Sequence, residues 1–324
     1  MSKEKLSQEY LERTAQNILS LEYFNQIVKD LDPSVKVILL KGEALLNSVY
    51  EDEGSRRLAE VDVLIRREDF SDFKNYLSSC GYRFTENIVP SSDVGYINSV
   101  MCKKDVKFWP AIHLHWHPVN NSFPAYMFAP RIDIGQIWKA AQPLDGYDNV
   151  LKMAPHHQLI YLSEHSLKHS FERPIHLRDI YMLIRRNKDS LDWDGVVTDA
   201  KKFNLGRAVY YALYFNSKIL EADIPEYVLE ELRPKKITFL EQRFIRSVLN
   251  HRQKSDSSYV VYLAMNEGLS NKIRFIYRTF FPPREAMGHL KDVSISKVNF
   301  IHYLSRVTRS VRTIRRLAST LLAG

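Results

Sequence analysis

The order of hydrophobic and polar positions divides the chain into a mixed first part and a helical second part. Apolar residues recur at helical spacing over residues 8–31, and an Asp-Pro pair then ends the pattern. The apolar run 35–40 is rich in valine and isoleucine and predicts a buried strand. A helix is expected over 43–50. A second strand is expected over 61–65, where apolar residues alternate with Asp62.

The remaining pattern completes a fold prediction. A helix is expected over 69–79, followed by three extended segments at 82–88, 95–102 and 111–118. After about residue 151, long stretches carry a period of 3.6 residues and few strand signals. We therefore predict an α+β protein, with a mixed-sheet domain over 1–150 and an all-helical domain over 151–324. The proline-rich segment 280–288 is expected to be a linker, before a last helix from about Lys297.

Composition adds the class of protein and its expected location. Hydrophobic residues make up 45% and charged residues 26% of the chain, as in ordinary globular proteins. The two cysteines form no disulfide framework and no CxxC pattern, which fits a reducing cytoplasm. The N-terminal segment is polar and unlike a secretory signal, and no apolar run reaches the ~20 residues of a membrane span. We expect a soluble, cytoplasmic protein without a transmembrane segment.

The positive charge is concentrated at the C-terminal end. The net charge is +8, and the segment from Asn271 onward holds eleven Lys and Arg residues against two acidic ones, so the rest of the chain carries about −1. The last predicted helix combines an apolar stripe with five flanking arginines, at 306, 309, 312, 315 and 316. Such a helix can meet an anionic membrane surface or nucleic acid. It can equally present a solvated face or pack within its own domain.

Two short features suggest chemistry. Glu60 and Asp62 should project from the same strand face, and a divalent cation is the usual partner of two carboxylates that lie so close. Taken alone, such a pair is more often a solvated polar face. Lys41-Gly42 lies between a strand and a helix, where backbone N–H groups and the ammonium could bind an anion. A phosphate site beside a metal site is what phosphoryl or nucleotidyl transfer requires.

At residues 37–65 the chain resembles the uncharacterised nucleotidyltransferase family, part of the polymerase-β-like nucleotidyltransferase superfamily. Members have a Lys-Gly turn, an arginine four residues before an Asp-x-Asp strand, and a helix that ends in Gly-Tyr. The corresponding positions here are Lys41-Gly42, Arg56, Glu60-Val61-Asp62 and Gly81-Tyr82. The segment AIHLHWHPV (111–119) and later helical blocks also resemble the family, so the likeness spans nearly the whole chain.

The resemblance implies transfer of a nucleoside monophosphate from an NTP to a hydroxyl-type acceptor, with Mg²⁺ (or Mn²⁺). It implies Glu60 and Asp62 as metal ligands and catalytic residues, and Lys41, Gly42 and Arg56 as nucleotide-binding residues. Two positions depart from the family pattern. Glu60 replaces an aspartate, and His113 stands where a third carboxylate would deprotonate the acceptor. Histidine can act as a base near neutral pH but is a poor Mg²⁺ ligand. A catalytically degenerate nucleotide-binding or regulatory protein is therefore the alternative.

The histidines suggest a further alternative. His113, His115 and His117 alternate on one strand face, and His165 and His169 are one helical turn apart. Histidines at either spacing can bind a zinc ion, so a zinc-dependent hydrolase is a third, less favoured hypothesis.

Overall fold

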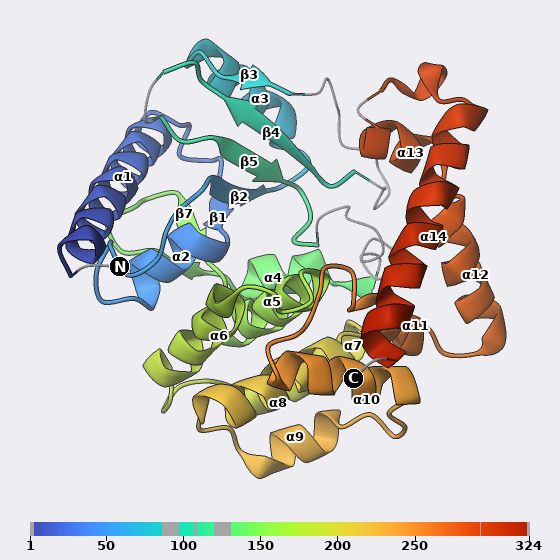
Figure 1. Cartoon of the computed structure of the whole chain (residues 1–324). Coiled ribbons are helices and arrows are strands. Elements are labelled where there is room, and N and C mark those ends of the chain that lie inside the picture. The colour runs from blue at the N-terminus through green and yellow to red at the C-terminus, as the bar shows by residue number, and fades with distance from the viewer. Residues whose placement is uncertain (1–2, 86–96, 107–108, 120–130, 292, 323–324) are drawn as a thin grey trace. The chain divides into compact units, whose positions relative to one another are not determined.

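The computed structural model describes residues 3–85, 97–106, 109–119, 131–291 and 293–322 (Figure 1). The chain separates into two compact units. Unit 1 comprises 1–118 and 134–154, and unit 2 comprises 119–133 and 155–324. Unit 1 contains a mixed β-sheet and the regular elements in the described part of unit 2 are helices, so the predicted α+β class is confirmed.

In the described residues, unit 1 forms one sheet of seven strands, in the order β3-β4-β5-β2-β1-β7-β6. The strands are β1 (Val37–Leu39), β2 (Val61–Ile65), β3 (Arg83–Phe84), β4 (Ser99–Lys103), β5 (Ile112–His115), β6 (Gln142–Pro143) and β7 (Val150–Lys152). The pairs β1–β7 and β2–β5 are parallel, and the other neighbours are antiparallel. Because β7 pairs with β1 in the middle of the sheet, unit 1 continues past residue 150 to Ala154.

The helices of unit 1 are α1 (Lys3–Lys29), α2 (Lys41–Ser48), α3 (Phe70–Ser79) and α4 (Ile134–Ala140). Residues of α1 and α3, such as Phe24 and Phe73, form one buried cluster with Val61, Val63 and Leu114 of the sheet. Side chains alternate between the two faces of a strand, so Asp62 and its neighbours in register belong to the opposite face. The core therefore fixes which strand residues can form a polar site.

Helix α1 also holds the loop that leads into β2. The Asn17 amide is buried and donates hydrogen bonds to the carbonyls of Glu53 and Arg56, while its oxygen accepts from the N–H of Leu58. Arg13 donates to the carbonyl of Gly54. These contacts, made across some forty residues of sequence, fix the backbone that presents Arg56.

Unit 2 is built around the buried helix α8. Its helices are α5 (Pro155–Lys168), α6 (Pro174–Arg186), α7 (Trp193–Lys202), α8 (Gly206–Leu220), α9 (Glu226–Leu232), α10 (Phe239–Leu249), α11 (Tyr259–Met265), α12 (Leu269–Phe280), α13 (Arg284–Lys291) and α14 (Phe300–Leu322), with the short 3₁₀ helix η3 (Ile295–Lys297). Aromatic side chains fill its centre, where Phe171, Phe215 and Phe244 pack edge to face or tilted.

The prediction of a linker over 280–288 is wrong for its second half. Helix α13 begins at Arg284, directly after Pro282-Pro283. Proline is compatible with the start of a helix because its missing N–H would have no partner there. None of the described helices is long and apolar enough to cross a membrane.

Candidate functional site

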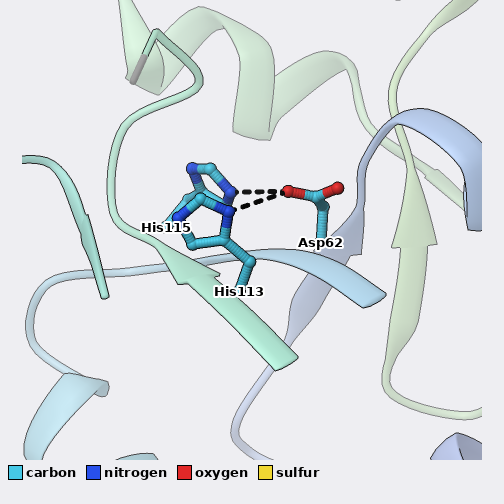
Figure 2. Close-up of side chains that lie close together, drawn as sticks. All are labelled: Asp62, His113 and His115. Atoms are coloured by element: carbon cyan, nitrogen blue, oxygen red, sulfur yellow. Dashed lines mark hydrogen bonds and ion pairs between the residues drawn. The ribbon is translucent and has the colours of Figure 1, made fainter. Parts of the chain in front are cut away.

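The register of two parallel strands brings one aspartate and two histidines together. Asp62 of β2 lies beside His113 of β5, and His115 follows two residues later on the same face. The Nε2 atom of His115 lies 2.9 Å from Asp62 Oδ1, and the Nδ1 atom of His113 lies 3.3 Å from the same oxygen (Figure 2). The ring centroids of the two histidines are 4.0 Å apart. Asp62 and His115 are buried.

Lys41 supplies a cation to this group. The N–H of Leu40 donates to the carbonyl of Asp62, which sets the start of α2 against β2. From the next position, the Lys41 ammonium reaches Asp62 Oδ1 at 2.6 Å. The backbone of Lys41 has a φ of 51°, a left-handed conformation that costs a non-glycine residue about 1 kcal/mol. The strained backbone conformation is therefore found at the same residue whose ammonium pairs with Asp62.

Glu60 and His113 give the site an arrangement that suits a metal ion. His113 Nδ1 is buried, makes no hydrogen bond, and lies 3.5 Å from Glu60 Oε1 and 3.3 Å from Asp62 Oδ1. Ligand atoms bound to one ion at about 2.1 Å are roughly 3.0–3.4 Å apart, so His113 Nδ1 is close to ligand spacing from each of the two carboxylate oxygens. Asp62, His113 and His115 also form a three-residue group whose donor atoms all lie within 4.8 Å. The residues present therefore fit a divalent ion.

Burial and neighbouring charges shift the pKa values of Asp62, His113 and His115. Burial opposes the ionisation of Asp62, but Lys41 and the two imidazoles outweigh it and hold the pKa of Asp62 well below its ordinary value. Burial likewise opposes protonation of His113, yet the Asp62 and Glu60 carboxylates raise its pKa. Burial and the nearby His113 lower the pKa of His115 well below the usual range, so His115 is neutral and donates from Nε2. The two histidines consequently have different chemistry, and His113 is the one suited to exchange a proton.

The role of Gly42 differs from the one expected, in which the glycine itself adopts the turn conformation. The left-handed residue is Lys41, and Gly42 is needed for close approach instead. A Cβ atom at Gly42 would lie 2.0 Å from Arg56 Nη1 and 2.8 Å from Leu58 Cδ2. The guanidinium of Arg56 therefore lies against the Cα of Gly42, beside the first turn of α2. The structure thus brings Lys41, Gly42 and Arg56 to one place, while their roles toward a nucleotide stay predictions.

The sequence pattern did not predict a role for Glu43. Its side chain is buried, with Oε2 3.4 Å from the N–H of Asp62 and Oε1 without a hydrogen-bond partner. Burial and the nearby Asp62 raise the pKa of Glu43 well above its ordinary value. The only signal was an acidic residue in an otherwise apolar stretch after Lys41-Gly42, and this pattern is also typical of an ordinary first helical turn.

The histidines of the zinc hypothesis are only partly brought together. His113 and His115 lie at ligand spacing with Asp62, and His117 is buried outside that group. In unit 2, the rings of His165 and His169 are 4.7 Å apart, and His176 lies beside both. Among the described residues these three form no group with donor atoms at ligand spacing.

Unit 2 contains a second group of one aspartate and two histidines. His157 Nε2 lies 3.0 Å from Asp199 Oδ2, and His156 Nε2 lies 3.6 Å from the same oxygen. His156 and His157 are adjacent on α5, and Asp199 belongs to α7. The imidazole of His157 also stacks against Phe203. Neither residue pattern nor spacing had pointed to this group.

Comparison with known proteins places the chain in one family. The family model described as uncharacterised nucleotidyltransferase matches residues 2–221. The chain belongs to this family, which the sequence resemblance had indicated. The match covers all of unit 1 and the first helices of unit 2. No curated protein and no solved structure matches the chain.

Proposed function

We propose that the protein transfers a nucleoside monophosphate from an NTP to a hydroxyl-type acceptor, with chemistry centred on Asp62. The observation that carries the proposal is the convergence of Lys41, His113 and His115 on Asp62, with Glu60 beside His113, in a chain that belongs to a nucleotidyltransferase family. A cationic side chain for phosphate, two carboxylates for a metal and one group able to take a proton are what this reaction requires.

Each residue has a separate role in the proposal. Lys41 neutralises Asp62 in the free protein, and its ammonium would bind a phosphate oxygen when the nucleotide arrives. Arg56, which lies against Gly42, adds positive charge for the triphosphate. His113 accepts the proton of the attacking hydroxyl, because its Nδ1 has no hydrogen-bond partner while Nε2 is 2.9 Å from the Ser99 hydroxyl.

Glu60 and Asp62 would hold Mg²⁺ or Mn²⁺, and His113 would stay outside the coordination of the ion so that its Nδ1 can take the proton. The bound ion would stabilise the negative charge that develops on the transferred phosphorus group. Glu60 is one methylene longer than aspartate and is about one third exposed, so its carboxylate can adjust to an ion more easily than that of Asp62.

The deciding experiment uses α-labelled NTPs, a cell extract as the source of acceptor, and Mg²⁺ or Mn²⁺. We expect label to pass to an acceptor with release of pyrophosphate. The substitution Asp62→Asn keeps the size of the side chain but removes its charge, and should lower transfer on the order of 100-fold or more. Asp199→Asn is the matched control, because Asp199 is also a buried aspartate bonded to a histidine. Full activity of the Asp62→Asn protein would refute the proposal.

A catalytically degenerate nucleotide-binding protein is the second candidate. It is favoured by the Lys41 ammonium at 2.6 Å from Asp62 and by a histidine at the third position. The hypothesis of a degenerate nucleotide-binding protein predicts NTP binding with no release of pyrophosphate over hours. Elemental analysis of the purified protein tests the zinc hypothesis, for which Asp62, His113 and His115 are the fitting donors. Stoichiometric zinc lost on Asp62→Asn would favour the hydrolase over transfer.

A further inference from the structure

Unit 2 has an unusual concentration of exposed apolar side chains near its C-terminal end. Twenty large hydrophobic residues are exposed in the described part of the chain, and twelve of them lie between residues 269 and 314. They belong mainly to α12 and α14, which run side by side along unit 2 (Figure 1). The side chain of Arg306 on α14 donates to the carbonyl of Thr279 on α12, so the two helices form one packed pair.

On α12 the exposed apolar residues form a single face. Leu269, Ile273 and Ile276 follow the spacing i, i+4, i+7, and they are 75%, 57% and 46% exposed. The packed side of this helix is marked by Phe275, which is 3% exposed. Arg274 is exposed next to the apolar face. The helix therefore contributes to the core with one side and leaves a second apolar side uncovered.

Helix α14 likewise has an exposed apolar face next to exposed arginines. Phe300, Leu304 and Val311 lie on one face and are exposed, with Phe300 at 77%. Three exposed arginines accompany them, at 309, 312 and 315. We define the basic apolar surface as the exposed apolar face of α12, the exposed apolar face of α14 and the cationic residues that flank them.

We propose that the basic apolar surface binds the anionic surface of a lipid bilayer. The charge supports this partner, because residues 269–324 contain eleven Lys and Arg residues and only two acidic ones. Apolar side chains flanked by cations enter the boundary between headgroups and acyl chains, while the cations contact anionic headgroups. The helices lie along such a surface and do not cross it.

Other partners explain only part of the pattern. Nucleic acid would use the cations and could stack on Phe300, but the leucine, isoleucine and valine side chains of the surface offer neither hydrogen bonds to phosphate nor stacking for bases. A second copy of the chain would cover the apolar faces, but a symmetric contact would bring two strongly cationic surfaces together. A bilayer with anionic lipids uses both features at once.

Helix α1 provides an internal contrast. It also exposes apolar residues, with Leu11 at 62% and Ile18 at 48%. Its sequence contains four Lys and Arg residues and four Glu residues, so it lacks the excess of positive charge. The double substitution Leu11→Ser/Ile18→Ser on α1 is therefore the matched control for Leu269→Ser/Ile273→Ser on α12.

The test is sedimentation of the full-length protein with vesicles of phosphatidylcholine, with and without about one third phosphatidylglycerol. We expect binding to the anionic vesicles only, and weakening of that binding by added salt. Leu269→Ser/Ile273→Ser and Arg312→Glu/Arg315→Glu should each lower vesicle affinity by roughly tenfold or more, while the α1 control leaves it unchanged. The substituted side chains are exposed, so circular dichroism should remain that of the native fold.

Three results would overturn the inference. The first is equal binding to neutral vesicles, or no binding to either kind. The second is binding to a duplex oligonucleotide that the Leu269→Ser/Ile273→Ser protein retains in full, because the apolar face would then have no part in recognition. The third is a dimer in light scattering that becomes a monomer on Leu269→Ser/Ile273→Ser without a change in vesicle binding. None of these results depends on nucleotidyl transfer, so the outcome is separate from the function proposed for Asp62.

Discussion

The chain contains the same three side chains twice, one aspartate and two histidines, in two different surroundings. In unit 1, Asp62 receives the imidazoles of His113 and His115 together with the Lys41 ammonium, and Glu60 stands nearby. In unit 2, Asp199 receives His157, and His156 is close. Donor spacing alone does not distinguish the two groups.

The difference lies in charge and in backbone setting. The Asp62 group combines the carboxylates of Asp62 and Glu60 with the ammonium of Lys41, whose own backbone is strained, and its histidines have pKa values displaced in opposite directions. The Asp199 group joins two helices, and the hydrogen bond from His157 satisfies a buried carboxylate. We interpret the first as a site for a ligand and the second as a structural link between α5 and α7. The following experiments, from the largest expected effect to the smallest, test that interpretation.

Removal of the Lys41 charge should separate nucleotide binding from metal binding. We expect Lys41→Met to raise the KM for NTP by roughly 10- to 100-fold, because the phosphate loses its cation. The same protein should bind Mn²⁺ more tightly in a calorimetric titration, because Asp62 is no longer neutralised by an ammonium. Lys202→Met, which breaks the exposed pair with Asp133, is the control and should change neither quantity. Weaker Mn²⁺ binding by Lys41→Met would contradict the metal assignment.

Substitution at the second group should affect stability and leave catalysis unchanged. Asp199→Asn replaces a charge-assisted bond to buried His157 and should lower the free energy of unfolding by about 1–3 kcal/mol. Chemical denaturation measures this loss, and the rate of transfer at saturating NTP should stay within about twofold of the wild-type rate. A large loss of transfer without a loss of stability would mean that Asp199 acts in the reaction.

Substitution of Gly42 tests the contact with Arg56. A methyl group at Gly42 must displace the guanidinium, so Gly42→Ala should lower kcat/KM by about tenfold with little change in unfolding. Gly206→Ala is the control, because a Cβ there meets only Leu232 at an ordinary distance of 3.8 Å. If Gly42→Ala behaves like Gly206→Ala, Arg56 has no positional role.

A change of pH should loosen the Asp199 group in a predictable direction. Burial and the nearby His156 lower the pKa of His157 below its value in the unfolded chain. The unfolded state therefore binds the proton more readily, and stability falls as the pH decreases through about 6.5. The protection factors of amides in α5 and α7, which are corrected for the intrinsic pH dependence of exchange, should fall between pH 7 and pH 5. His157→Gln should reduce this pH dependence, and an unchanged profile would show that another group is responsible.

The elements around the site could be predicted because short apolar runs and alternation determine strands locally. The alternation at 61–65 places Asp62 on one face, and the spacing of His113 and His115 does the same on β5. Other features could not be predicted, because they depend on neighbours distant in sequence. No residue near Gly42 in the sequence indicates that the side chains of Arg56 and Leu58 pack against it. Likewise, His157 and Asp199 are 42 residues apart and meet only after α5 and α7 pack.

The ion pair between Lys41 and Asp62 has a consequence for how the protein exists in the cell. A buried carboxylate without a counter-ion would make folding depend on metal supply. Here the chain carries its own counter-ion, 2.6 Å from the carboxylate, so we expect the fold to form before any divalent ion is bound. Under the proposed function, chelation should therefore abolish nucleotidyl transfer without unfolding the protein. Added metal should then restore transfer without a slow refolding phase.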